Sequence, residues 1–402
     1  MADSDPHPPP PFQAGRRGER VRGDVWLGFE PRSAGGLEVR LRSRVAALYG
    51  EATRELLEGL LQEAGVEHGV LHVDDSGAYP FLLRARMEAL LQRVLGDDGF
   101  RVAPEPPLGP PAGPPQRERR RRSRLYLPGD QARYFLNAAL HRPDGVILDL
   151  EDSVAPAAKR DALAVVRHAL HTMDFGDCER MVRVQQGEAG LREIAALKDA
   201  PFHLVLLPKV ESADEVRAAA AALDGTEVLL MPILETARGV LRAEEITAAS
   251  PRVVALTLGL EDLTADLGVA KTQEGRESLW ARSRVVHAAR AVGVQPIDSV
   301  YGDVADEEGL RRSVREAKAL GFEGKGCVHP RQIRVVHEEF APTPEEVERA
   351  LAIARAFEEA EARGAGVVSL GSKMIDPPVV KRALRIVAEA RRDGLLPVEE
   401  GR

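Results

Sequence analysis

The feature that most constrains this 402-residue chain is a regular alternation of short apolar runs and amphipathic stretches between residues 121 and 340. Apolar runs of this kind are typical of parallel strands buried on both faces, each followed by a helix that crosses back. Eight such runs begin at Leu125, Gly145, Met181, Leu204, Val228, Val253, Gln295 and Gly326. Eight units favour a closed barrel over an open sheet, and no Gly-x-Gly-x-x-Gly follows the first run to indicate dinucleotide binding. We therefore predict an α/β fold built on a (β/α)8 barrel.

The composition divides the rest of the chain around this barrel. A segment before it is dense first in proline and then in arginine, which prevents a helix and favours an extended linker. The predicted boundaries are a disordered tail over 1–14, a small α+β domain over 15–97, a linker over 98–120, the barrel over 121–340, and a C-terminal helix and lid over 341–402. We interpret the arginines from Arg117 to Arg124 as the solvated end of the linker, the alternative being a patch that binds a polyanion.

Charge and hydropathy exclude several classes of protein. The formal net charge of −8 argues against general nucleic-acid binding. No apolar run approaches the roughly 18 residues of a membrane helix, and the first residues lack the basic start and apolar segment of a secretory signal. We expect a cytoplasmic protein with no membrane partner. The two cysteines, Cys178 and Cys327, lack metal or redox spacing, which excludes a disulfide scaffold or a cysteine-rich zinc site.

Charged residues follow or end most of the predicted strands, at the end of a barrel where active sites form. Arg183 lies between two valines and therefore faces away from them. The other charged residues are Asp149, Glu151, Asp152, Lys209, Glu235, Glu261, Asp262, Asp298 and His329. So many carboxylates at one mouth would repel each other unless a cation lay among them, and oxygen donors without a Cys/His cluster favour Mg2+ over Zn2+. One carboxylate alone is equally well explained by a helix cap or a salt bridge.

Several segments resemble the citrate lyase beta subunit and its relatives in the HpcH/HpaI aldolase/citrate lyase superfamily. They are Arg124-Leu-Tyr-Leu-Pro-Gly-Asp, Asp149-Leu-Glu-Asp-Ser-Val, Pro232-Ile-Leu-Glu-Thr-Ala-Arg-Gly, Gly259-Leu-Glu-Asp-Leu, Gly324-Lys-Gly-Cys-Val-His-Pro-Arg-Gln-Ile and Gly366-Val-Val-Ser-Leu-Gly-Ser-Lys-Met-Ile-Asp. The resemblance implies a Mg2+-dependent carbon–carbon lyase that forms a trimer or hexamer. It also implies a citrate lyase alpha subunit as a partner.

The resemblance also assigns roles to residues. Glu235 and Asp262 match the two metal-binding carboxylates, and Arg183 matches the arginine that clamps the keto-acid carboxylate. Asp376 matches an aspartate on a C-terminal lid that enters the site of a neighbouring subunit. Supporting residues at the second strand end, where they could position water around the metal, are Asp149, Glu151 and Asp152.

These roles suit the cleavage of a 3-hydroxyacyl thioester to a keto acid and a thioester enolate. An arginine holds a carboxylate through two parallel hydrogen bonds, and a lid carboxylate shielded from water can protonate the enolate. The alternative for Asp376 is a cap of the last helix. A Schiff base at Lys209 is a rival mechanism. We expect His329 to be packed, or to support the metal ligands from behind, rather than to bind metal itself.

The N-terminal domain resembles the acyl carrier (gamma) subunit of citrate lyase, through Gly23-Asp-Val, Val73-Asp-Asp-Ser-Gly-Ala and Leu83-Arg-Ala-Arg-Met-Glu-Ala-Leu-Leu. In that family the serine before Gly-Asp-Val carries the prosthetic arm, but here the position is Arg22, which has no hydroxyl. Either the domain is a scaffold and the barrel uses an acyl-CoA or a separate acyl-carrier thioester, or Ser33 or Ser43 replaces the serine. The cluster Arg16, Arg17, Arg20 and Arg22 is either a solvated loop or a cradle for CoA phosphates.

Three functions therefore remain at this point. The first is a lyase that cleaves a citryl thioester to oxaloacetate and an acetyl thioester. The second is a stand-alone malyl-CoA or citramalyl-CoA lyase, which the arginine at position 22 favours. The third is a carrier or scaffold with a silent barrel, against which the set Arg183, Glu235, Asp262 and Asp376 argues.

Overall fold

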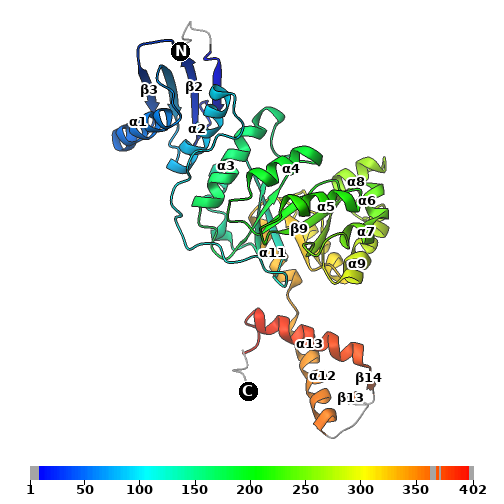
Figure 1. Cartoon of the computed structure of the whole chain (residues 1–402). Coiled ribbons are helices and arrows are strands. Elements are labelled where there is room, and N and C mark those ends of the chain that lie inside the picture. Colours follow the sequence, from blue (N-terminus) through cyan, green and yellow to red (C-terminus); the bar gives the residue numbers. More distant parts are fainter. Residues whose placement is uncertain (1–8, 363–367, 371–372, 398–402) are drawn as a thin grey trace.

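The computed structural model of the chain describes residues 9–362, 368–370 and 373–397 (Figure 1). Its centre is a closed barrel of eight parallel strands in the order β10-β11-β12-β5-β6-β7-β8-β9. The strands are β5 (Ser123–Pro128), β6 (Gly145–Asp149), β7 (Glu179–Arg183), β8 (Leu204–Leu207), β9 (Leu229–Leu234), β10 (Ala255–Leu258), β11 (Gln295–Asp298) and β12 (Gly324–Cys327). The predicted (β/α)8 barrel is confirmed.

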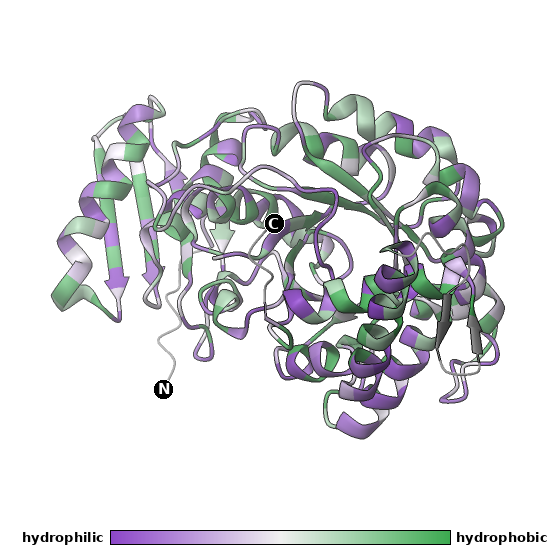
Figure 2. Ribbon diagram, turned by 90° about the horizontal axis from the view of Figure 1, so that it is seen from below, coloured by the Kyte–Doolittle hydropathy of each residue, from purple (hydrophilic) through white to green (hydrophobic). Residues whose placement is uncertain are grey.

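Helices surround the strands on the outside of the barrel. The crossover from β5 to β6 consists of short 3-10 turns, whereas the others contain α-helices. The turns between β5 and β6 are η1 (Ala132–Tyr134) and η2 (Ala139–His141), and a further turn, η3 (Pro156–Ala158), follows β6. The helices are α3 (Lys159–Thr172), α4 (Gly187–Ala196), α5 (Ala213–Ala222), α6 (Ala237–Leu241), α7 (Ala243–Thr247), α8 (Leu260–Asp266), α9 (Leu279–Val292), α10 (Glu307–Leu320) and α11 (Arg331–Phe340). Figure 2 shows apolar strands enclosed by helices whose outer faces are largely hydrophilic. No described helix is long and apolar enough to cross a membrane.

The strand register decides which side chains face the barrel interior. Tyr126 is opposite Ile147, and Ile147 is opposite Met181, so these three share the interior layer. Because side chains alternate between faces along a strand, the interior position two residues further along β6 and β7 falls at Asp149 and Arg183. The alternation therefore places an apolar layer in the barrel and charged side chains at its mouth.

The N-terminal part is a four-stranded sheet with two helices, as the predicted α+β domain requires. The strand order is β1-β2-β4-β3, with β3 and β4 parallel and the other pairs antiparallel. The elements are β1 (Phe12–Gly15), β2 (Val25–Pro31), β3 (Leu37–Ser43), α1 (Ala46–Glu63), β4 (Gly69–Asp75) and α2 (Pro80–Leu95).

Buried ion pairs join this domain to the barrel along α2 and α3. Glu88 on α2 contacts Arg167 at 3.2 Å and His168 at 3.2 Å, and its carboxylate also accepts the backbone N–H of Val102. Arg93 on α2 pairs with Asp161 at 2.5 Å. Because these groups are mostly buried, the domain is packed on the barrel and is not tethered loosely to it (Figure 1).

Residues 97–122 form no helix or strand, yet part of this segment is buried against the barrel. Arg121 is 1% exposed and binds both carboxylate oxygens of Glu179 at 2.7 Å. The interpretation of these arginines as a solvated end is therefore wrong for Arg121, and also for Arg124, which is 1% exposed within β5. Glu179 begins β7, 58 residues further along the chain, so only the fold brings the two charges together.

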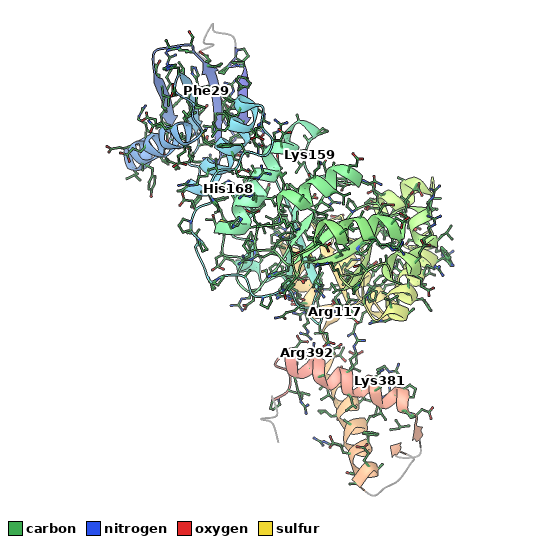
Figure 3. The ribbon with its side chains drawn as sticks, in the orientation of Figure 1. Phe29, Arg117, Lys159, His168, Lys381 and Arg392 are labelled. Atoms are coloured by element: carbon green, nitrogen blue, oxygen red, sulfur yellow. The ribbon has the colours of Figure 1, made fainter. Side chains whose placement is uncertain are left out.

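The C-terminal part is a helical hairpin that lies beyond the end of the barrel opposite the mouth. It contains α12 (Pro344–Ala362), β13 (Val368–Leu370), β14 (Lys373–Ile375) and α13 (Pro377–Arg392). Arg122, which precedes β5, pairs with Asp393 just after α13 at 3.1 Å. In Figure 3, Lys381 and Arg392 lie on the far side of Arg117 from Lys159. Lys159 donates to the carbonyl of Leu150 at the mouth, so the hairpin and the mouth are at opposite ends.

Candidate active site

An arginine and an aspartate from neighbouring strands form the first part of the mouth. Arg183 donates from Nε and Nη2 to the two oxygens of Asp149 at 2.6 and 2.7 Å, and its Nη1 lies 2.8 Å from Glu151. The guanidinium also lies 5.2 Å from the centre of the Tyr126 ring. Since a guanidinium has five N–H groups, these contacts leave one on Nη1 and one on Nη2 for a further anion.

The two charges of this pair stabilise each other. Burial alone would raise the pKa of Asp149, but the hydrogen bonds and charge of Arg183 outweigh burial and lower it. Burial alone would lower the pKa of Arg183, but the hydrogen bonds and charge of Asp149 outweigh burial and raise it. Both groups are therefore ionised, and Asp149 fixes the orientation of the guanidinium.

Lys209 stands among carboxylates from three strand ends. Its Nζ lies 2.8 Å from Glu151, 3.6 Å from Asp152 and 3.8 Å from Asp262, and its backbone N–H donates to Glu235 at 2.7 Å. The backbone of Lys209 is left-handed, with φ at +49°. Burial alone would lower the pKa of the amine, but the hydrogen bond and charge of Glu151 outweigh burial and raise it. A Schiff base needs a neutral amine, so this environment argues against that rival mechanism.

Glu235 is a buried carboxylate at the end of β9, with 3% of its surface exposed. Burial, together with the negative charges of Asp262 and Glu151, raises its pKa to about 8. Gly259 makes room for it, since a Cβ at Gly259 would lie 2.2 Å from Oε2 of Glu235. The fold therefore keeps a carboxylate where its own charge is unfavourable, and a bound cation would relieve this.

Asp262 lies in the first turn of α8, and its side chain is 42% exposed. It shares Lys209 as a neighbour with Glu235. Among the residues that the structure describes, no group of three or more His, Cys, Asp or Glu side chains could enclose a metal ion. Mg2+ commonly binds to one or two carboxylates and keeps water or substrate oxygens as its other ligands. The pair Glu235 and Asp262 fits that mode of binding and does not fit a closed structural site.

The structure brings together most of the charged residues that the sequence analysis placed at the mouth, but not all of them. Asp298 is fully buried on the outer face of the barrel, with Arg282 at 3.0 Å and Lys325 at 2.8 Å. The expectation that Asp298 faces the mouth is therefore wrong. Glu261 points to Lys271 at 2.5 Å. His329 is half-buried, and its Nδ1 accepts the backbone N–H of Arg331.

Asp376 is far from the mouth of its own chain. It is the exposed residue at the N-terminal cap position of α13, and its side chain makes no cap hydrogen bond. The hairpin that carries it lies beyond the opposite end of the barrel (Figure 1). Any part that Asp376 takes in the reaction would therefore require a second copy of the chain.

Two contributors to the mouth were not predicted, Tyr126 and Gly259. Tyr126 lies under the guanidinium of Arg183, and Gly259 provides space for Glu235. Tyr126 stands two residues after Arg124 on the same strand, so alternation could have marked both as facing the interior. The sequence contains no comparable signal for Gly259, because its function depends on a neighbouring strand.

A closed barrel whose mouth combines a guanidinium with crowded carboxylates is typical of an enzyme that binds anionic substrates through a hard cation. The sequence pattern of the HpcH/HpaI aldolase/citrate lyase family matches residues 122–330. The chain belongs to this family, and it is a carbon–carbon lyase. A second pattern, of the acyl carrier family described as malonate decarboxylase delta subunit, matches residues 17–94.

Individual relatives agree with this assignment. The chain is 38% identical to citrate lyase subunit beta of Haemophilus influenzae over 286 residues, which cover 68% of this chain and 98% of that protein. It is 36% identical to mitochondrial citramalyl-CoA lyase of Mus musculus, with 67% of this chain and 86% of that protein covered. Among solved structures, CitE of Mycobacterium tuberculosis in complex with magnesium, acetoacetate and coenzyme A is 33% identical and has a TM-score of 0.58, with 69% of this chain and 100% of that chain covered.

Proposed function

We propose that this protein is a Mg2+-dependent lyase that cleaves a citryl thioester to oxaloacetate and an acetyl thioester. The observation that carries the proposal is the cluster at the barrel mouth. Arg183 and Lys209 share the carboxylate of Glu151, and Lys209 also contacts the pair of carboxylates Glu235 and Asp262. The similarity to citrate lyase subunit beta over nearly the whole length of that protein supports the citryl group as the first choice.

Arg183 binds the carboxylate that becomes part of the keto acid. Its remaining N–H groups on Nη1 and Nη2 suit a bidentate contact, which a lysine could not make. Asp149 holds the guanidinium in place through two short hydrogen bonds. The substrate carboxylate therefore meets a donor group whose orientation is fixed before binding.

Glu235 and Asp262 would hold the magnesium ion. Bound there, the ion would supply a positive charge to the oxygens of the substrate as the hydroxyl becomes a carbonyl. The CitE structure in complex with magnesium, acetoacetate and coenzyme A supports this assignment. Lys209 keeps Glu235 in position through its backbone N–H and balances part of the negative charge of Glu151.

Cleavage leaves the enolate of the acetyl thioester, which must take up a proton. We assign this step to Asp376 of a second copy, because the hairpin of one chain extends away from its own mouth. The assignment requires a homo-oligomer, and we expect a trimer or hexamer. A citrate lyase alpha subunit is needed only if the substrate is held by a separate carrier. We place the reaction in the cytoplasm.

The test is to offer citryl-CoA, malyl-CoA and citramalyl-CoA separately to the full-length protein with Mg2+ and to identify the keto acid released. We expect oxaloacetate from citryl-CoA. The matched variant is Arg183→Lys, which keeps the charge but loses the two parallel bonds, and which we expect to raise KM and lower kcat. Release of no keto acid from any of the three would contradict the proposal.

A stand-alone malyl-CoA or citramalyl-CoA lyase is the second candidate. It is favoured by Arg22, which cannot carry a covalent arm, and by the similarity to citramalyl-CoA lyase. Glyoxylate from malyl-CoA, or pyruvate from citramalyl-CoA, as the fastest product would identify this second function.

A further inference from the structure

A short arginine-rich loop of the N-terminal domain lies at the rim of the barrel mouth. We name residues 16–22 the basic strap; they connect β1 to β2. Arg16 pairs with Asp130 at 3.5 Å, and Asp130 belongs to the loop that follows β5. In the same loop, the N–H of Gly129 donates to the carbonyl of Asp149, the residue that holds Arg183. The basic strap is therefore next to the loop that adjoins the proposed substrate clamp.

Further contacts hold the strap in this position. The N–H of Gly15 donates to Asp161 in the first turn of α3 at 2.8 Å. Arg86 is 1% exposed, pairs with Asp24 at 2.8 Å and also donates to the carbonyl of Asp130 at 3.1 Å. Both ends of the strap are thus anchored to loops at the C-terminal end of the barrel strands, by groups that are mostly buried.

The backbone of the strap is also fixed within its own domain. Gly15 has a φ of +83°, and a Cβ there would lie 2.0 Å from the carbonyl oxygen of Val25, so only glycine fits. Arg44 donates to the carbonyl of Val21 at 3.2 Å and to that of Glu19 at 3.4 Å. The N–H of Gly23 donates to Ser76 at 2.9 Å.

These anchors leave two cations of the strap free to bind a ligand. Arg16 is paired with Asp130, and Arg17 lies over the ring of Trp26 at 4.2 Å. Arg20 and Arg22 are exposed, and neither forms an ion pair with any residue that the structure describes. Glu19 is the one acidic residue of the strap. The strap therefore presents net positive charge beside the mouth.

We propose that Arg20 and Arg22 bind the phosphate groups of a free coenzyme A thioester whose acyl end lies at the barrel mouth. This inference rests on the proposed function and specifies its substrate as a CoA thioester that is not attached to a carrier. Both arginines are exposed on the strap, and arginine and phosphate are well matched for charge-assisted hydrogen bonds.

The test measures binding of coenzyme A and of pantetheine, which lacks the phosphates, to the full-length protein by calorimetry. The variants are Arg20→Gln/Arg22→Gln and the control Arg217→Gln, which removes an exposed arginine on α5. We expect the wild type to bind coenzyme A more tightly than pantetheine. We expect the double variant to lose about tenfold or more in affinity for coenzyme A and nothing for pantetheine, since a hydrogen bond to a charged group contributes roughly 1.5–3 kcal/mol. The control should behave like the wild type.

Equal binding of coenzyme A by the wild type and the double variant would overturn the proposal, as would a wild type that does not distinguish coenzyme A from pantetheine. The measurement is separate from catalysis. If the double variant loses affinity for coenzyme A but the wild type releases no keto acid, the phosphate site is supported and the proposed function is contradicted. If the wild type releases a keto acid but the double variant binds coenzyme A as tightly as the wild type does, the proposed function is supported and the phosphate site is contradicted.

Discussion

The mouth of the barrel and the seam between α2 and α3 both contain partly buried charges, but the charges are balanced differently. At the seam, Arg86 and Arg93 meet Asp161, and Glu88 meets Arg167 and His168. At the mouth, two cations face a larger set of carboxylates, which are Asp149, Glu151, Asp152, Glu235 and Asp262.

This difference in charge balance indicates that the seam has a structural role and that the mouth has a functional one. At the seam, Asp161 and Glu88 each have at least one arginine partner, and such pairs hold two surfaces together. Burial, together with the negative charges of Asp262 and Glu151, raises the pKa of Glu235 to about 8. Such a surplus of carboxylates is stable only at a site that receives a positive charge from a bound ligand. The seam should therefore respond to mutation through stability, and the mouth through activity.

The largest expected effect is at the mouth. Glu235→Gln keeps the shape and the acceptor for the N–H of Lys209 but removes a proposed metal ligand. We expect kcat to fall at least about a thousandfold, because several kcal/mol of charge stabilisation in the transition state is lost. The free energy of unfolding should not fall. The control is Glu261→Gln. Glu261 stands one position before Asp262 but pairs with Lys271, so this variant should leave kcat unchanged. Similar kcat values for Glu235→Gln and Glu261→Gln would contradict the functional role assigned to the mouth.

The next effect concerns Asp376, which belongs to neither region in its own chain. Asp376→Ala should lower kcat about a hundredfold or more through loss of the proposed proton donor, and should leave the unfolding midpoint unchanged. Mixing this variant with Glu235→Gln under conditions that exchange subunits should restore activity. A mixture that stays inactive would mean that the hairpin does not act in a second copy.

The seam should lose stability when one of its charges is removed. Arg86→Met leaves the carboxylates of Asp24 and Asp161 in a buried site, which we expect to lower the free energy of unfolding by about 3 kcal/mol. Denaturant unfolding checks this value. Adding Asp24→Asn should recover part of the loss, because Asp24 loses its arginine partner whereas Asp161 keeps Arg93.

The smallest effect is on pH dependence and concerns His203, which precedes β8 at the other end of the barrel. Its Nδ1 accepts the N–H of Arg180 at 2.8 Å, and its Nε2 lies 3.0 Å from the carbonyl of Gly113, so the ring is held neutral. Burial lowers its pKa to about 4. Between about pH 6.5 and 4 the unfolded chain binds a proton that the folded chain does not, so stability falls as the pH falls, by at most about 3 kcal/mol. His203→Gln should flatten this part of the profile, and an unchanged slope would contradict the assignment.

The barrel could be predicted from the sequence because its signal is local and repeats eight times. The mouth was harder, since a parallel strand buried on both faces does not reveal which face a charged residue takes. Asp149 and Asp298 both end apolar strands, yet one faces the mouth and the other lies among Arg282 and Lys325 outside the barrel. Only the register, which depends on the neighbouring strands, separates them.

Contacts between residues that are distant in the chain could not be predicted from the sequence. Arg121 looks like one of a run of solvated arginines, and its burial depends on Glu179 at the start of another strand. The left-handed backbone of Lys209, which directs its N–H to Glu235, is equally a product of the assembled barrel. The family resemblance assigned roles to residues, but it did not place the N-terminal strap at the rim.

The central claim is that the unbalanced carboxylates of the mouth are a site for a hard divalent cation. The most direct test is to measure binding of Mn2+, as a spectroscopic substitute for Mg2+, to the wild type and to Glu235→Gln/Asp262→Asn by electron paramagnetic resonance, with Mg2+ as competitor. We predict one site per chain in the wild type, displaced by Mg2+ and absent from the double variant. Equal binding to both proteins would contradict the account.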